Sequence, residues 1–223
     1  MTRELFAQAM GKFFAGLIVM ALLLFVPAGT LRYWQGWLLL AILFVPMFAA
    51  GIVMMFKNPE LLKKRLNAKE TEREQKQVIA LSGLMFLAAF IVAGLNFRFG
   101  WLPLPRWGVW LAAAVFLLAY ALYAEVLREN VWLSRTIEVQ EHQTVVDTGL
   151  YGVVRHPMYA VTLLLFLSMP LVLGSPLSFL ITLLYIPIIV KRIRNEEDVL
   201  KDGLEGYAEY MTRVKYRLVP GIW

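Results

Sequence analysis

The stretch PMYAVTLLLFLSMPLVLGSPLSFLITLLYIPIIV, residues 157–190, decides the fold class of this chain. It runs for 34 residues without a charged side chain, although about 20 apolar residues are enough to cross a bilayer. Near its middle stands Gly174-Ser175-Pro176, a combination that is typical of a turn. The stretch is therefore predicted to fold into two short helices that form a membrane hairpin.

Four other uncharged runs precede this stretch, at residues 13–29, 33–56, 77–97 and 107–124. Each is close to the length of one membrane helix. We therefore expect an all-α fold, a polytopic integral membrane bundle with about four spanning helices, the C-terminal hairpin and a cytoplasmic C-terminal helical tail. Because no repeat or linker divides the chain, one membrane domain is expected over 1–223, with transmembrane helices in 1–127 and the cofactor-binding catalytic region in 128–223.

The composition excludes several classes of chemistry. The chain is 60% hydrophobic and 17% charged, whereas an ordinary soluble domain has about 45–50% apolar and about 25% charged residues. The absence of cysteine excludes disulfides, thiolate nucleophiles and Cys-type zinc or iron–sulfur sites. The net charge of +6 does not indicate nucleic-acid binding, because the basic residues lie between long apolar stretches. Anionic lipid headgroups are the expected partner of these residues.

The distribution of Lys and Arg predicts the orientation of the helices. Of the 22 basic residues, all but Arg32, Arg98 and Arg106 fall before the first run, in 57–76, in 128–155 or after residue 190. Basic residues are concentrated on the cytoplasmic side of membrane proteins. Both termini and the active site are therefore expected to face the cytoplasm, and 57–76 is expected to be a polar, helical connector that lies on the headgroups.

The residues suited to chemistry gather in the C-terminal half. Residues 149–159 read GLYGVVRHPMY, in which Pro157 is typical of the first position of a helix. His156 would then cap this helix, where unpaired backbone N–H groups and the neighbouring Arg155 attract a carboxylate or a phosphate. The alternative is that these polar residues lie among lipid headgroups and that the tyrosines belong to an interfacial aromatic belt.

A second polar cluster, KRIRNEED at residues 191–198, follows the hairpin. If the helix continues beyond the membrane, Arg192 and Glu196 lie one turn apart on one face. Because a hairpin returns the chain to the side that it left, this cluster can meet the first one. Together they would suit a zwitterion such as the amino-acid part of S-adenosylmethionine, or an aminophospholipid. A solvated helix end with local ion pairs is the alternative.

The order of these motifs resembles the isoprenylcysteine carboxyl methyltransferase family and its phospholipid methyltransferase relatives. The resemblance covers residues 138–220 and rests on Val139-Gln140, Thr144-Val145-Val146, Gly149-Leu150-Tyr151, Arg155-His156-Pro157-Met158-Tyr159, Arg192 with Glu196-Glu197, Tyr207, Tyr210, and Arg217 to Pro220. It implies a short strand-like piece at 144–146. In two places the chain departs from the family pattern: Gln143 stands where many relatives have histidine, and a motif glycine is displaced to the position before Tyr207.

What the resemblance implies is an S-adenosylmethionine-dependent methyltransferase with a cofactor pocket that faces the cytoplasm. The cofactor-binding residues that it implies are Gln140, Gln143, Thr144, Val145, Val146, Tyr151, His156, Pro157, Met158, Tyr159, Glu196 and Glu197. The expected catalytic residues are Arg192, His156 and Glu196, and Arg192 occupies the position that meets the methyl acceptor in the family. No metal site is expected.

The acceptor is expected to be lipophilic, a small or prenylated molecule that enters between helices from the bilayer. An isoprenylcysteine-type carboxylate is favoured, because Arg192 can hold an ionised carboxylate and no general base is then required. A phospholipid or another amine is the alternative, with His156, Glu196 or Glu197 as the proton acceptor. Further alternatives are a nicotinamide-dependent reductase, since sterol reductases resemble these motifs, and a non-enzymatic membrane protein.

Overall fold

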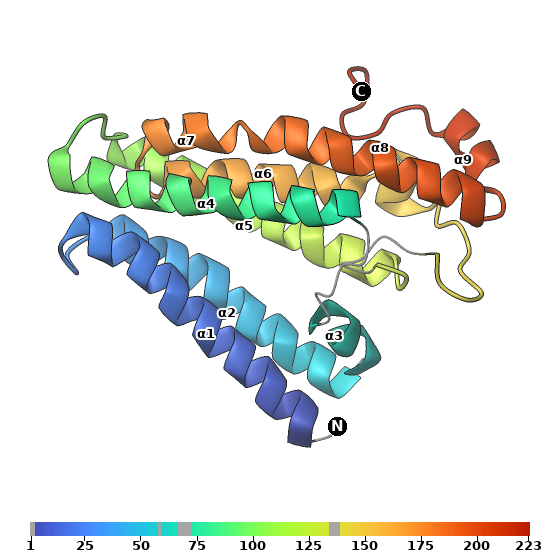
Figure 1. Cartoon of the computed structure of the whole chain (residues 1–223), viewed down its shortest axis with the longest axis horizontal. Coiled ribbons are helices and arrows are strands. Elements are labelled where there is room, and N and C mark those ends of the chain that lie inside the picture. Colours follow the sequence, from blue (N-terminus) through green and yellow to red (C-terminus); the bar gives the residue numbers. More distant parts are fainter. Residues whose placement is uncertain (1–2, 58, 67–72, 134–138) are drawn as a thin grey trace.

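The computed structural model describes residues 3–57, 59–66, 73–133 and 139–223, and its regular elements in these ranges are all helices, with no strand among them (Figure 1). The helices are α1 (Arg3–Ala28), α2 (Trp34–Lys57), α3 (Pro59–Leu66), α4 (Arg73–Phe99), α5 (Arg106–Glu129), the 3-10 helix η1 (Gly149–Gly152), α6 (Pro157–Val172), α7 (Pro176–Thr182), α8 (Tyr185–Gly203) and α9 (Tyr207–Arg213). The prediction of a strand-like piece at 144–146 is wrong, since this segment is irregular.

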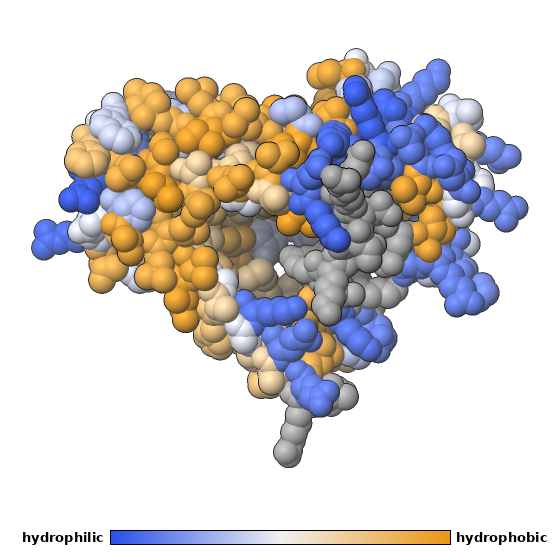
Figure 2. Space-filling view, in the orientation of Figure 1, coloured by the Kyte–Doolittle hydropathy of each residue, from blue (hydrophilic) through white to orange (hydrophobic). Residues whose placement is uncertain are grey.

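Within the described ranges, five segments are long and apolar enough to cross a membrane: Glu4–Ala28, Trp34–Lys57, Lys76–Phe99, Arg106–Glu129 and Pro176–Gly203. The apolar helix α6 is shorter than these. Apolar side chains cover the shaft of the bundle, while hydrophilic ones gather over the end that carries α3 and α9 (Figure 2). The predicted polytopic integral membrane bundle is therefore confirmed.

The predicted hairpin turn lies where the sequence places it. Gly174 adopts a positive φ of 73°, which glycine adopts without a steric penalty. Ser175 caps α7, its side chain accepting a hydrogen bond of 3.2 Å from the backbone N–H of Ser178, and Pro176 occupies the first turn. The hairpin thus consists of α6 and the pair α7 and α8.

The second arm of the hairpin is longer than predicted. The helix is interrupted between α7 and α8 at residues 183 and 184, because Pro187 has no N–H to donate to the carbonyl of Leu183. It then continues past residue 190 to Gly203, so that Arg192 and Glu196 lie on the same helix as the apolar segment.

The first helix also extends beyond its predicted bounds. It begins at Arg3 rather than at residue 13, and Lys12 is part of it. The Lys12 ammonium group donates a hydrogen bond of 2.6 Å to the carbonyl of Leu66, at the end of α3. The connector predicted at 57–76 contains α3, while residues 58 and 67–72 lie outside the described ranges.

Polar contacts fix the far end of the bundle. The Tyr33 hydroxyl donates to the carbonyl of Leu173 at 2.7 Å, and the backbone N–H of Leu104 donates to the carbonyl of Gly174 at 3.0 Å. Asn96 exchanges hydrogen bonds of 3.1 and 3.0 Å with the backbone of Leu102. Since such groups have no water to bind within a bilayer, these bonds hold the hairpin turn against its neighbours.

The arrangement of the turns places both ends of the chain on one side. The turns between α1 and α2, α4 and α5, and α6 and α7 lie at one end of the bundle, and both termini lie toward the end with α3 and α9 (Figure 1). The start of α6 and the end of α8 therefore meet at the same end as the termini.

Candidate active site

A cavity lies at the end of the bundle where α5, α6 and α8 meet η1 and α9. It comprises about 820 Å³ of empty space, part of which is open to solvent. The predicted site residues that line it are Gln143, Thr144, Val145, Val146, Tyr151, His156, Met158, Tyr159, Arg192 and Glu196. The two polar clusters of the sequence therefore do meet in space.

Three residues implied as cofactor contacts do not line the cavity. The Gln140 side chain donates a hydrogen bond of 2.6 Å to the carbonyl of Trp132, and its backbone N–H donates to the side-chain oxygen of Gln143 at 2.9 Å. Pro157 is buried at the first position of α6. Glu197 faces away from the cavity and is only 1% exposed.

Arg155, which the sequence indicated as an anion-binding group, also lines the cavity. Other lining residues were not among the predicted site residues: Asn130, Trp132, Leu133, Leu200, Leu204, Tyr207 and Tyr210. The tyrosines of α9 belong to the motifs on which the resemblance rests, so the sequence held a signal for them. The residues that follow α5 carry no such signal, because only the tertiary fold brings the end of this helix against η1.

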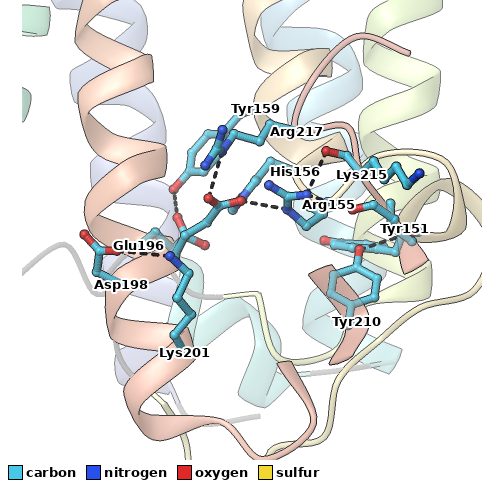
Figure 3. A network of polar contacts seen from close by, with 12 residues as sticks. Tyr151, Arg155, His156, Tyr159, Glu196, Asp198, Lys201, Tyr210, Lys215 and Arg217 are labelled. Carbon is cyan, nitrogen blue, oxygen red and sulfur yellow. Dashed lines mark hydrogen bonds and ion pairs between the residues drawn. The ribbon is translucent and has the colours of Figure 1, made fainter. Parts of the chain in front are cut away.

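One phenol joins the opposite charges of the cavity, and its contact with Glu196 is drawn in Figure 3. The Tyr159 hydroxyl donates a hydrogen bond to the Glu196 carboxylate and accepts one of 2.9 Å from Arg192 Nε. The Arg192 guanidinium also lies 5.9 Å from the centre of the Tyr159 ring, a distance typical of a cation–π contact. The predicted pairing of Arg192 and Glu196 on one face of α8 is thus bridged by a residue of α6.

A buried carboxylate lies directly behind this pair. Glu197 accepts hydrogen bonds of 2.8 Å from Arg155 Nε and from Arg217 Nε, and its Oε1 lies 3.3 Å from His156 Nε2. Because a buried anion is costly unless it is paired, these partners explain how the side chain is accommodated.

Arg155 and His156 are further held by the segment 214–218, which we call the C-terminal strap. Their backbone N–H groups donate at 2.9 Å to the carbonyls of Tyr216 and Arg217, and Arg155 Nη1 donates to those of Val214 and Lys215. The carboxylate that Arg155 attracts is therefore that of Glu197, while the backbone N–H groups of Arg155 and His156 bind carbonyls of the strap.

The remaining walls of the cavity are also anchored. The Glu129 carboxylate, at the end of α5, accepts hydrogen bonds from the backbone N–H of Leu150 at 3.1 Å and from the Thr148 hydroxyl at 3.3 Å. Asp147 forms an ion pair of 2.8 Å with Arg213 of α9. These contacts fix η1 and the residues before it against α5 and α9.

Comparison with known families identifies the core of this site. Residues 106–205 match the family model of the phospholipid methyltransferases. This part of the chain belongs to that family. No curated protein matches the chain closely enough to be compared with it. Together with the apolar helices, the family match indicates an integral membrane methyltransferase.

Phospholipid methyltransferases in general use S-adenosylmethionine, and the cavity offers groups that fit it. The hydroxyl of Tyr207 is buried at the cavity and has no hydrogen-bond partner within the described part of the chain, while that of Tyr151 is buried beside Asn130. Burial raises the pKa of both phenols, so they remain protonated donors at neutral pH. An amino-acid or nucleoside moiety would satisfy such groups, and Glu196 provides a carboxylate for an ammonium.

Proposed function

We propose that this protein transfers the methyl group of S-adenosylmethionine to the carboxylate of a lipophilic acceptor. The favoured acceptor is an isoprenylcysteine-type molecule. The observation that carries the proposal is the Arg192–Tyr159–Glu196 chain in the cavity wall, which offers a cation and an anion side by side.

Bound S-adenosylmethionine supplies an electrophilic methyl group on a positively charged sulfur. Transfer of this group is a displacement that depends on the alignment of donor and acceptor. Glu196 would bind the ammonium of the cofactor, and the hydroxyls of Tyr151 and Tyr207 would bind its polar atoms. His156, whose ring is held by Glu197, would form the wall beside them.

Arg192 would hold the acceptor. A guanidinium group binds a carboxylate through paired hydrogen bonds, and a carboxylate is already ionised near neutral pH. No proton acceptor is therefore needed in the displacement. The membrane side of the same region favours an apolar acceptor, because Tyr159 packs in a hydrophobic cluster with Tyr185 and Ile189.

Methylation of an amine, as on a phospholipid headgroup, is the second candidate, and the family match favours it. An ammonium must lose a proton before it can be methylated. Glu196 and His156 line the cavity and are the groups that would accept this proton. The two candidates therefore differ in whether a general base is required.

Both candidates are tested by incubating the purified full chain with radiolabelled S-adenosylmethionine and fractionated native lipids. We expect label in the lipid phase that is released by mild base, as from a methyl ester. Label that resists base would identify an amine acceptor and would overturn carboxylate methylation. If the labelled cofactor does not bind to the protein at all, methyl transfer itself would be ruled out.

A further inference from the structure

The two adjacent glutamates of α8 lie in different environments. Glu196 lines the cavity and bonds to Tyr159. Glu197 does not line it and is 1% exposed, and its oxygens bind Arg155 and Arg217, which come from two other segments. Successive residues of a helix point about 100° apart, so only one of the two can face the cavity. The resemblance, which implies both as cofactor contacts, does not distinguish them.

The contacts of Glu197 lead to the C-terminal strap. Its Oε1 is bound by Arg155, and its Oε2 accepts a hydrogen bond of 2.8 Å from Arg217 Nε. The carboxylate therefore joins α8 to the segment before α6 on one side and to the strap on the other. Removal of one partner would leave part of a buried carboxylate uncompensated, which is costly.

Arg217 is bound at several points of the same network. Its carbonyl accepts the hydrogen bond from the backbone N–H of His156, and its guanidinium lies 5.2 Å from the centre of the Trp223 ring. The side chain is 29% exposed. The adjacent Leu218 is buried in the cluster that contains Tyr159. Arg217 therefore fixes the strap against both sides of the hairpin.

We infer that Glu197 and Arg217 are positioning residues for cofactor binding. They act through Arg155 and His156, whose side chains form one wall of the cavity, and they make the C-terminal strap part of the active site although it lies beyond the matched family segment. This inference rests on the proposed function, because the wall that they hold is the one assigned to the cofactor.

Three variants of the full-length protein test the inference: Arg217→Gln, Arg217→Lys and Glu197→Gln. The matched control is Lys201→Gln. Like Arg217→Gln, it removes one positive charge. Lys201 lies near the end of α8 and pairs with the exposed Asp198 at 3.4 Å rather than with Glu197, so its loss should not disturb the network. The dissociation constant of S-adenosylmethionine and the KM of the acceptor are measured for each variant, at a temperature far below its unfolding transition.

We expect Arg217→Gln to weaken cofactor binding about tenfold, a usual size for coupling between distinct groups. The acceptor KM at saturating cofactor should not change, and Arg217→Lys should recover most of the affinity. The double variant Glu197→Gln with Arg217→Gln should bind the cofactor no more weakly than the weaker of the two single variants, because both act through one carboxylate. Cofactor binding by Arg217→Gln that equals that of Lys201→Gln would overturn the inference, as would additive losses in the double variant.

Hydrogen exchange provides a readout that needs no cofactor. In Arg217→Gln, the amides of Arg155 and His156 should exchange faster, whereas those in the middle of α5 should keep their protection. Unchanged exchange at 155–156 in Arg217→Gln would contradict the proposed role of the strap. The protection of α5 in the same sample shows whether the variant is folded, so the readout also holds for a variant that is too unstable for kinetics. If the wild-type protein binds no cofactor, the proposed function fails, whereas the exchange result still tests the strap.

Discussion

Arg192 donates from its Nε a hydrogen bond of 2.9 Å to the hydroxyl of Tyr159. The two residues lie 33 positions apart in the chain and meet because the hairpin brings the start of α6 beside α8. The same hydroxyl donates to Glu196, so the cation and the anion of the cavity share one phenol. Arg192 and Glu196 are assigned to different ligands, the acceptor and the cofactor, so substitution of one or the other should separate the two functions.

Replacement of Arg192 by alanine should abolish methyl transfer and leave cofactor binding largely intact. The guanidinium is assigned to the acceptor, and the loss of one charged donor at a reacting group lowers kcat about a hundredfold or more. The check is to measure transfer of labelled methyl groups and cofactor affinity in the same preparation.

The control for this variant is Arg194→Ala, which removes an exposed arginine two residues further along α8. It should transfer methyl groups at the wild-type rate. Equal losses of transfer and of cofactor affinity in Arg192→Ala would show that Arg192 does not serve the acceptor alone.

Replacement of Tyr159 by phenylalanine should lower kcat/KM about tenfold, because a hydrogen bond to a charged group contributes about 1.5–3 kcal/mol. The ring contacts with His156 and Arg192 would remain, so the unfolding temperature should change little. Tyr216→Phe, at an exposed tyrosine, is the control. Wild-type kinetics in Tyr159→Phe would mean that the phenol does not orient the two charged groups.

The sequence predicted those features that depend on local chain properties. The uncharged runs predicted the apolar helices because the length of such a run alone decides whether it can cross a bilayer. The turn at Gly174-Ser175-Pro176 was predicted because these residues favour it through their own backbone preferences. Helix ends were predicted less well, since helices such as α1 extend with charged residues beyond the apolar run.

The partners within the site could not be predicted in this way. Arg155, next to a helix start, carries a sequence signal for anion binding, and the anion that its guanidinium binds is Glu197 of the same chain, beside carbonyls of the strap. Those partners come from segments more than 40 residues away, and no local pattern specifies them. Which of two adjacent glutamates faces the cavity likewise depends on how α8 packs.

The orientation in the membrane can be tested with single cysteines, because the natural chain has none. The positive-inside distribution predicts that α9 faces the cytoplasm and that the turn after α4 faces outward. Trp101, in the turn after α4, and Glu209, in α9, are both exposed, at opposite ends of the bundle. In intact cells, a membrane-impermeant thiol reagent should therefore label Trp101→Cys, on the outer side, but not Glu209→Cys, on the cytoplasmic side.

After the membrane is permeabilised, both variants should be labelled, and the cysteine-free protein should stay unlabelled in either condition. Labelling of Glu209→Cys in intact cells, with Trp101→Cys protected, would reverse the orientation and place the cavity on the outer side.

The packing of α1 against α4 is tested by two glycines of α4. A Cβ added at Gly94 would lie 2.8 Å from the carbonyl oxygen of Leu24 and 2.9 Å from the Pro27 Cβ. A Cβ at Gly83 would meet nothing within 4 Å. Because close approach of membrane helices depends on small residues, Gly94→Ala should force the two helices apart and destabilise the protein by about 1–3 kcal/mol.

Gly83→Ala should instead raise the free energy of unfolding by about 0.5–1 kcal/mol, because alanine loses less backbone entropy than glycine when it folds into a helix. Thermal unfolding of both variants in the same detergent gives the comparison directly. The two glycines share one helix, so an effect on helix propensity alone would move both in the same direction. Stabilisation by Gly94→Ala would therefore show that α1 does not approach α4 at this point.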